Sequence, residues 1–276
     1  MAADQGNMPF IKNLASSDRK IRTSALSTLR TFLSAPTTAR KLTDLDYLKL
    51  WKGLFYSVWM CDRPIPQQNL CTELAELLSV LPAPSDDEGA VVIPFLRAFW
   101  ATLAREWTSI DVLRMEKFLL LVRRVFGASL AWAGGGGTGK RGKGEKDGRW
   151  TGPRAEGMLR LLEEWPLEAT GNLAKVPVGL RLHVIDIWVD EAEKLELLDR
   201  EDEQESAEED KSGKVQFLDR LRDIVEVQAK STCKPVRMRA KESLTDDRLP
   251  WNTASSDHEM ADDGHDGRDS WDGFDD

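Results

Sequence analysis

Apolar side chains recur at intervals of three and four residues along most of the chain, and this spacing constrains the fold more than any other feature. Between residues 17 and 34 one apolar residue stands at every fourth position, which places the set on one face of an amphipathic helix. The set comprises Ile21, Ala25, Leu29 and Leu33. The Val/Ile alternation of a half-buried strand is missing. The pattern predicts about ten helices and no strand.

Capping residues and prolines predict where several helices begin and end. Thr43 followed by Asp46 resembles a capping box, so a helix is expected from there to about Cys61. A second helix is expected over 64–82, because prolines are favoured in the first turn of a helix and soon after its end. These two helices predict an antiparallel hairpin.

A second hairpin is expected over residues 91–130. Its two helices are separated near Thr108 and Asp111, which again offer a cap. Three further helices are predicted over 154–165, 177–198 and 214–230. The helix over 110–126 is apolar around much of its circumference, including Leu113, so we expect it to pack between neighbours.

Consecutive hairpins in units of roughly 40 residues are typical of HEAT or armadillo stacks. We therefore predict an all-α fold, a HEAT/armadillo-like stack of antiparallel helix hairpins. The predicted organisation is an N-terminal helical-repeat part (1–132), a flexible Gly/Lys-rich insert (133–152), the remainder of the stack (153–249) with an acidic loop (199–211), and an acidic disordered tail (250–276).

Charge is distributed unevenly along a chain whose formal net charge is −9. Residues 199–210 carry a net charge of −7 and residues 252–276 carry −8, which leaves +6 on the rest of the chain. A mildly basic body with two acidic segments is compatible with nucleic acid as a partner. No apolar stretch reaches the roughly 18 residues of a membrane-spanning helix, so no membrane partner is expected.

Candidate catalytic and cofactor-binding residues give weak signals. The segment GGGGTGK (134–140) resembles a P-loop, but Arg141 stands where a hydroxyl must bind magnesium, and the residues before it continue a helix. His183 has no metal-ligand spacing and is interpreted as structural, and Cys61 and Cys71 as core thiols. The carboxylates Asp186, Asp190, Glu191, Asp111 and Glu116 are better explained by a solvated or salt-bridged face than by acid–base catalysis. We expect no enzyme, cofactor, metal or small-molecule substrate.

Basic and aromatic residues supply the candidate binding surfaces. Cations at helical spacing, in the Gly/Lys-rich insert and near residue 237 are the predicted RNA contacts, with solvated faces as the alternative. They are Arg114, Lys117, Arg123, Arg124, Lys140, Arg141, Lys143, Lys234, Arg237 and Arg239. Aromatic residues and their polar neighbours are the predicted protein contacts, with core packing as the alternative for each ring. They are Trp51, Phe55, Tyr56, Trp59, Asp62, Arg63, Gln67, Arg105, Glu106 and Trp107.

The segment LKLWKGLFYSVWMCDRPIPQQNLCTELAELL (48–78) resembles the eukaryotic ribosomal RNA-processing protein 1 family, also called the nucleolar protein Nop-fifty-two family. PFIKNLASSDRKIRTSAL, FWATLAREWTSIDVLRMEKFLLLVRRV and PVGLRLHVIDIWVDEAEK agree with it. The resemblance implies a nucleus and nucleolus location, membership of pre-60S particles, and a role in precursor rRNA processing as a helical scaffold for other large-subunit assembly factors.

Two features depart from that family pattern. Family members often carry long basic C-terminal extensions, whereas this chain ends in an acidic segment, and the Gly-rich insert is unexpected. The rival hypothesis is a general helical-repeat adaptor for protein interactions, unrelated to ribosomes. Sedimentation of the native protein with or without pre-60S particles separates the two.

Overall fold

The computed structural model describes residues 10–82, 90–135, 150–199 and 208–252, and every regular element within those ranges is helical. This confirms the predicted all-α fold. The elements are α1 (Phe10–Leu14), α2 (Arg19–Ser34), α3 (Pro36–Ala39), α4 (Asp44–Trp59), α5 (Pro64–Ala75), α6 (Leu77–Val80), α7 (Val92–Glu106), the 3-10 helix η1 (Trp107–Ser109), α8 (Val112–Ala133), α9 (Pro153–Glu164), α10 (Val178–Lys194), α11 (Glu208–Gln228) and α12 (Lys234–Ser243).

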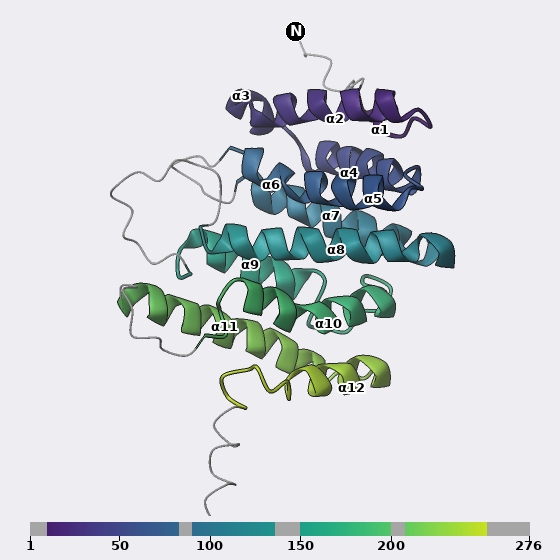
Figure 1. Ribbon diagram of the computed structural model, residues 1–276. Helices are drawn as coiled ribbons and strands as arrows, with labels where there is room; N and C mark the ends of the chain where they lie inside the picture. The colour runs from purple at the N-terminus through teal and green to yellow at the C-terminus, as the bar shows by residue number, and fades with distance from the viewer. Residues whose placement is uncertain (1–9, 83–89, 136–149, 200–207, 253–276) are drawn as a thin grey trace, which may run out of the picture.

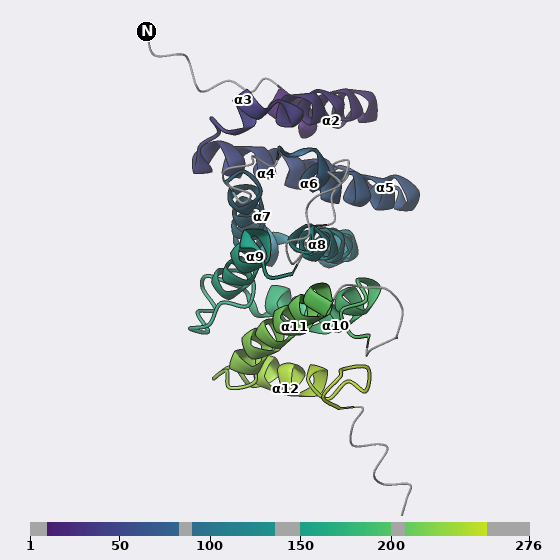
Figure 2. The ribbon, with the colours of Figure 1, turned by 90° about the vertical axis from the view of Figure 1, so that its left-hand side faces the viewer.

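The helices stack along one direction in two layers (Figure 1). One layer contains α1, α4, α7, α9 and α11, each packed against the next, and the other contains α5, α8, α10 and α12. At the N-terminal end, α2 packs on α1 and on α6. Figure 2 shows α4, α7 and α9 in one column and α5, α8 and α10 in another. Each unit of the stack therefore pairs one helix from each layer.

Helices α4 and α7, neighbours in one layer, run parallel, as the contacts between their rings show. The ring of Tyr47 lies 6.3 Å from that of Phe95, and Trp51 lies 4.9 Å from Phe95 and 4.8 Å from Phe99. Later residues of α4 thus meet later residues of α7. Parallel neighbours within a layer, joined through the opposite layer, are the arrangement of a HEAT-like stack.

Local capping fixes the start of α4 as the sequence predicts. The backbone N–H of Asp46 donates to the Thr43 hydroxyl at 3.3 Å, and the N–H of Thr43 donates to the Asp46 carboxylate at 3.0 Å. Two backbone donors that the first turn leaves without helical acceptors are satisfied in this way. The capping box is confirmed.

Two predicted boundaries are wrong. The helix expected over 64–82 is interrupted at Glu76, where α5 ends and α6 begins. The start of α8 is capped by Asp111 alone, whose carboxylate accepts from the N–H of Arg114 at 3.1 Å. Thr108 lies within η1 instead, because the chain makes one 3-10 turn between α7 and α8.

A repeated contact closes the turn inside four of the helix pairs. The fourth residue of α2, α5, α10 and α12 donates in each case to a backbone carbonyl of the turn before its helix. The bonds are Arg22 Nη1 to Ser16 O at 2.8 Å, Gln67 Nε2 to Cys61 O at 2.7 Å, Arg181 Nη1 to Glu168 O at 2.6 Å, and Arg237 Nη1 to Ser231 O at 2.7 Å. We call these four residues the turn donors. They satisfy carbonyls beyond the helix ends.

Some residues within the ranges of the expected insert, acidic loop and tail pack against the helices. Trp150 is buried with its ring 4.9 Å from that of Phe217, so the end of the Gly/Lys-rich insert belongs to the core. Helix α11 already begins at Glu208, inside the expected acidic loop. The ring of Trp251 lies under the Arg222 guanidinium at 4.6 Å, which ties the start of the tail to α11. Residues 136–149, 200–207 and 253–276 lie outside the described residues.

Candidate docking surface

Lys117 ties the turn between α4 and α5 to the beginning of α8. Its Nζ donates to the carbonyl oxygens of Trp59 at 2.8 Å and Cys61 at 2.9 Å, and lies 3.4 Å from Asp62 Oδ1. Burial lowers the pKa of this ammonium group, although the charge of Asp62 acts in the opposite direction. The contact fixes the turn between α4 and α5 against the first part of α8 and so gives this edge of the stack a defined shape.

Five exposed apolar residues lie at the end of α4 and at the starts of α5 and α8. Val112 and Leu113, the first two residues of α8, are 84% and 89% exposed, and Ile65, the second residue of α5, is 71% exposed. Tyr56 and Met60 at the end of α4 are each 36% exposed. We call these five residues the turn-edge patch. Because contiguous exposed apolar surface marks protein-interaction sites, these residues are the candidates for a docking surface.

A rigid aromatic base lies beside the turn-edge patch. The Trp59 ring packs 6.2 Å from that of Phe118 and 6.4 Å from that of Tyr56. The guanidinium of Arg114 lies 4.9 Å from the centre of the Trp59 ring, in cation–π geometry. These contacts restrict the motion of Trp59 and Tyr56, so little conformational entropy is left to lose when a partner binds.

Charges along the same edge are largely balanced. Arg105 Nε lies 2.8 Å from the Glu106 carboxylate, and Arg114 is paired with Asp111. Arg63 has no hydrogen bond or ion pair with any residue that the structure describes. An edge that is apolar and nearly neutral is better suited to a protein than to a polyanion, because nucleic-acid affinity depends on unpaired positive charge.

The predicted protein contacts divide into exposed and buried groups. Trp51 is 0% exposed, Phe55 2% and Trp107 6%, so these three rings belong to the core and the prediction of surface roles for them is wrong. Tertiary contacts with other helices, rather than the spacing of these rings in the sequence, determine this burial. The exposed or half-buried candidates that line the turn edge are Tyr56, Trp59, Asp62, Arg63, Gln67, Arg105 and Glu106.

Sequence reasoning missed the most exposed members of the patch. Leu113 was expected to pack between neighbouring helices, yet it is the more exposed of the first two residues of α8. Its position two residues after the Asp111 cap is the available signal, because it places Leu113 in the first turn, at the very end of α8. Val112, Ile65 and Met60 carried no sequence prediction of surface exposure.

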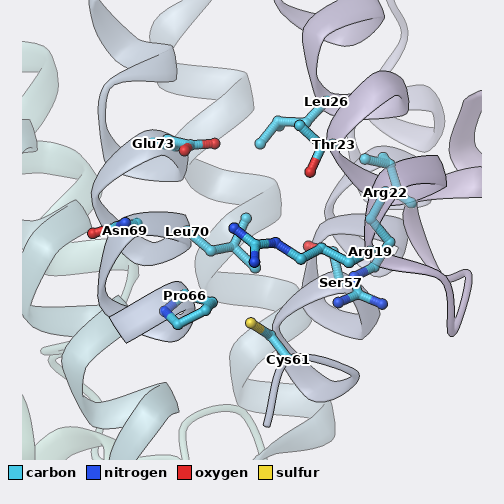
Figure 3. A pocket seen from close by; sticks show the side chains of 11 residues that line it. Arg19, Arg22, Thr23, Leu26, Ser57, Cys61, Pro66, Asn69, Leu70 and Glu73 are labelled. Carbon is cyan, nitrogen blue, oxygen red and sulfur yellow. The ribbon is translucent and has the colours of Figure 1, made fainter. Parts of the chain in front are cut away.

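A small hollow separates the first two helical units on the side of α2 and α5 (Figure 3). Its volume is about 90 Å³, well below the 300 Å³ or more that is typical of small-molecule sites. The Arg19 side chain extends across it toward Leu70, with Glu73 further along the same wall (Figure 3). The hollow is a local gap in packing rather than a substrate cavity.

Most predicted RNA contacts in the described residues already have partners. Lys117 is buried, so the prediction that it contacts RNA is wrong. Arg237 is a turn donor, and Arg239 Nη1 lies 2.6 Å from the Asp186 carboxylate. The exposed candidates without a described partner are Arg124 and Lys234. Lys140, Arg141 and Lys143 lie outside the described residues.

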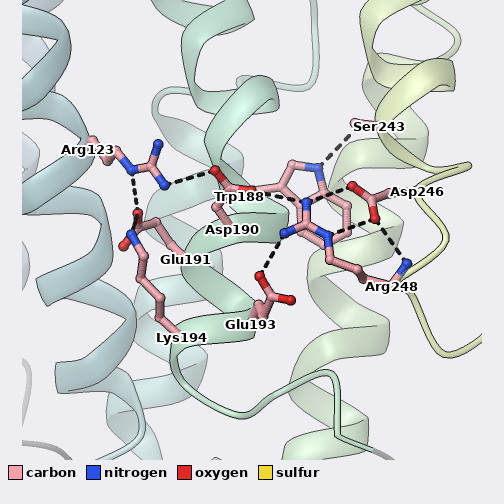
Figure 4. Close-up of polar contacts among 9 residues, drawn as sticks. All are labelled: Arg123, Trp188, Asp190, Glu191, Glu193, Lys194, Ser243, Asp246 and Arg248. Atoms are coloured by element: carbon pink, nitrogen blue, oxygen red, sulfur yellow. Dashed lines mark hydrogen bonds and ion pairs between the residues drawn. The ribbon is translucent and has the colours of Figure 1, made fainter.

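Arg123, another predicted RNA contact, joins an ion-pair network between α8 and α10 (Figure 4). Its guanidinium lies 2.7 Å from the Glu191 carboxylate and 2.8 Å from that of Asp190. On the far side of α10, Arg248 pairs with Asp190 at 3.0 Å and Glu193 at 2.7 Å. The two arginines more than offset the effect of burial and lower the pKa of Asp190. This network confirms the predicted salt-bridged face.

The remaining candidates for chemistry have structural surroundings. His183 is half-buried and its Nε2 lies 2.9 Å from the Leu119 carbonyl, as expected of a structural histidine. Cys61 and Cys71 are both buried thiols, also as predicted. The described residues contain no cluster of three metal-ligating side chains. No helix among them is long and apolar enough to cross a membrane. Helix α8 runs up to Ala133, so a helix precedes the P-loop-like segment.

A parallel stack of helix pairs with an exposed apolar edge defines a helical-repeat protein, a class that binds other macromolecules across extended surfaces. Residues 5–273 match the family model described as "Nucleolar protein, Nop52". The chain belongs to the Nop52 family of nucleolar proteins, and the family resemblance predicted from the sequence is confirmed.

Curated relatives carry names that refer to ribosomal RNA processing. The chain is 31% identical over 196 residues to Ribosomal RNA processing protein 1 homolog B of Homo sapiens, which covers 70% of this chain and 23% of the relative. It is 33% identical over 186 residues to homolog A of Homo sapiens, covering 67% and 36%. A Dictyostelium discoideum homolog is 26% identical over 192 residues. The chain spans about a quarter to a third of the two human proteins.

Proposed function

We propose that this chain is a non-catalytic assembly factor of pre-60S ribosomal particles that supports precursor rRNA processing in the nucleolus. In this proposal the stack is a scaffold, and the turn-edge patch docks other large-subunit assembly factors. Membership of the Nop52 family, with relatives named for ribosomal RNA processing, supports the cellular process. The scaffold role rests on the surface itself.

The exposure of Val112 and Leu113 is the observation that carries the scaffold proposal. Two neighbouring aliphatic side chains more than four-fifths exposed contribute almost nothing to folding. Each would gain roughly 1.5–3 kcal/mol from complete burial against a partner. The fixed Trp59 and Tyr56 rings beside them add the aromatic area that interface hot spots favour.

Particle sedimentation with a double variant tests the proposal. Val112→Asp with Leu113→Asp places two carboxylates in the first turn of α8, where the helix dipole favours negative charge, so folding should be unaffected. We expect the variant to shift from pre-60S fractions to light fractions on a sucrose gradient. Because the two wild-type side chains are so exposed, the shift would reflect lost docking.

A matched control uses exposed apolar residues elsewhere on the stack. Val215 in α11 and Met238 in α12 are 59% and 57% exposed, so Val215→Asp with Met238→Asp adds the same charge away from the turn edge. This control should stay in pre-60S fractions. Equal behaviour of the two variants would show that the turn-edge patch is not the docking site.

Depletion of the protein addresses the cellular role. Stalled large-subunit precursors are expected, because an assembly scaffold is needed before the precursor RNA can be processed. Unchanged precursors, together with a wild-type protein confined to light fractions, would favour the general adaptor unrelated to ribosomes.

A further inference from the structure

Positive charge is concentrated at the N-terminal end of the stack. Residues 10–63 carry ten Lys and Arg side chains and four carboxylates, a net charge of +6. That equals the whole excess left once the acidic segments 199–210 and 252–276 are set aside. Three of the four carboxylates are already engaged, since Asp18 and Asp46 cap helices and Asp62 faces the buried Lys117. Residues 64–82, which complete the first two helical units, add Glu73 and Glu76 and no cation, so these two units together carry a net charge of +4.

Eight of those ten cations are exposed and have no hydrogen bond or ion pair with any residue in the described ranges. They are Lys12, Arg19, Lys20, Arg40, Lys41, Lys49, Lys52 and Arg63. The middle of the stack is different, because Arg97 pairs with Glu164 at 2.9 Å and Arg123 pairs with two carboxylates. Unpaired like charges repel one another and destabilise the compact state slightly. A negatively charged partner bound to this region would relieve that repulsion.

Helix α4 displays part of this charge on one face. Lys49 and Lys52 stand one helical turn apart and both are exposed, so they project from the same side of α4. A Cβ at Gly53 would lie 3.1 Å from Ile11 Cγ2 and 3.3 Å from Ile11 O, so α1 passes directly over this glycine. That close approach brings Lys12, which follows Ile11, alongside the α4 lysines. We call these three lysines, together with the exposed Lys41 in the turn that precedes α4, the N-terminal basic surface.

We propose that the N-terminal basic surface binds the phosphate backbone of RNA. Each exposed lysine can neutralise one phosphate and release a bound counterion, which drives association with a polyanion. Phosphate contacts of this kind carry no base specificity and serve to position the protein. The inference rests on the proposed function, in which precursor rRNA is the polyanion that the scaffold meets.

A comparison of two triple-lysine variants of the full chain tests this inference. One carries Lys41→Gln, Lys49→Gln and Lys52→Gln at the N-terminal end. The other carries Lys230→Gln, Lys234→Gln and Lys241→Gln around α12, where all three lysines are also exposed without a described partner. The two variants lose the same charge, and the second set includes Lys234, a sequence-predicted RNA contact.

Affinity for a labelled single-stranded RNA of mixed sequence is measured by fluorescence anisotropy over a series of salt concentrations. We expect the N-terminal variant to lower the slope of log affinity against log salt by about 2, because each single-strand phosphate contact contributes about 0.7. The α12 variant should keep the wild-type slope. Equal slopes in both variants, a larger loss in the α12 variant, or a wild-type chain that does not bind RNA would overturn the inference.

Polyglutamate serves as a second probe, because an acidic protein could also satisfy these lysines. Binding of polyglutamate but not RNA, lost in the N-terminal variant, would identify an acidic protein as the partner and reject RNA. Purified components contain no assembly factors, so this result is independent of particle sedimentation. If the turn-edge variant no longer sediments with pre-60S particles but still binds RNA, the result bears on the scaffold proposal and not on the RNA-binding inference.

Discussion

The ammonium group of Lys117 satisfies a backbone carbonyl that no other described donor reaches. The Cys61 carbonyl also accepts from Gln67, whereas Nζ of Lys117 is the described donor to the Trp59 carbonyl. Lys117→Met keeps the aliphatic stem but leaves that part-buried carbonyl without its described donor, which costs about 1–3 kcal/mol. We expect the free energy of unfolding, measured by urea denaturation, to fall by about 2 kcal/mol.

Arg124 provides the control for this prediction on the same helix. It is exposed and has no described hydrogen bond or ion pair. Arg124→Met should change the free energy of unfolding by less than about 0.5 kcal/mol. If the two methionine variants are equally stable, the buried ammonium does not hold the turn.

His183 gives the fold a pH dependence just below neutrality. Burial is the largest influence and lowers the pKa of the imidazole below its ordinary 6.5, although the bond to the Leu119 carbonyl acts in the opposite direction. As pH falls below 6.5, the unfolded chain therefore takes up this proton before the folded chain does. Stability is present at neutral pH and is lost as pH falls from there.

His183→Gln removes this titration while keeping a side-chain donor for the Leu119 carbonyl. The midpoint of urea unfolding should decline less for the variant than for the wild type between about pH 6.5 and 5. At lower pH both proteins should weaken alike, because the carboxylates of Asp190 and Asp246, whose pKa values are lowered by arginine partners, begin to protonate. Parallel curves across the upper window would exclude a contribution from His183.

The turn donors reveal an internal repeat that the sequence conceals. Arginine occupies the fourth position of three helices and Gln67 that of α5, while α8 has Met115 there and its neighbouring turn is held by Lys117. Different side chains thus perform one task, so no residue identity recurs at a fixed period. The helical units can be aligned by these equivalent hydrogen bonds but not by the identities of their residues.

Helix positions could be predicted from the sequence because their causes are local. The apolar period of α2 and the capping box at Thr43 involve residues within four positions of each other. The burial of Trp51 and Lys117 depends on helices more than 40 residues away, α7 for Trp51 and the α4–α5 turn for Lys117. The predicted protein contacts therefore overlap the turn edge that we propose as a docking surface, while the most exposed residues there, Val112 and Leu113, were not among them.

Arg237→Ala tests whether a turn donor stabilises its own helix pair. The change removes a charged donor from the Ser231 carbonyl at the junction of α11 and α12, which should cost about 1.5–3 kcal/mol. Repeat stacks open locally, so amide hydrogen exchange should become faster in α11 and α12 and stay unchanged in α4 to α8.

Lys234→Ala in the same helix is the control, because Lys234 is exposed and has no described partner. It should leave exchange rates in α11 and α12 as they are in the wild type. Uniformly faster exchange along the whole stack of the Arg237 variant would contradict a local role for the turn donor.

The whole molecule separates two kinds of surface along one stack. The turn-edge patch is apolar with mostly paired charges, whereas the N-terminal basic surface is cationic and unpaired. Salt screens exposed charges, with a Debye length near 10 Å at 0.1 M and about 3 Å at 1 M, but leaves apolar burial largely intact. The two surfaces should therefore respond differently to ionic strength.

Affinity purification from cells, at moderate and at high salt, makes this difference measurable. With the wild-type chain we expect assembly factors and precursor RNA together at moderate salt, and assembly factors without directly bound RNA at high salt. The turn-edge double variant should lose the proteins, and purified variant protein should still bind RNA. The N-terminal lysine variant should keep the proteins at both salt concentrations. If either variant loses proteins and RNA together in every assay, the two surfaces act as one site; if the wild type recovers neither, the ribosome-assembly proposal fails.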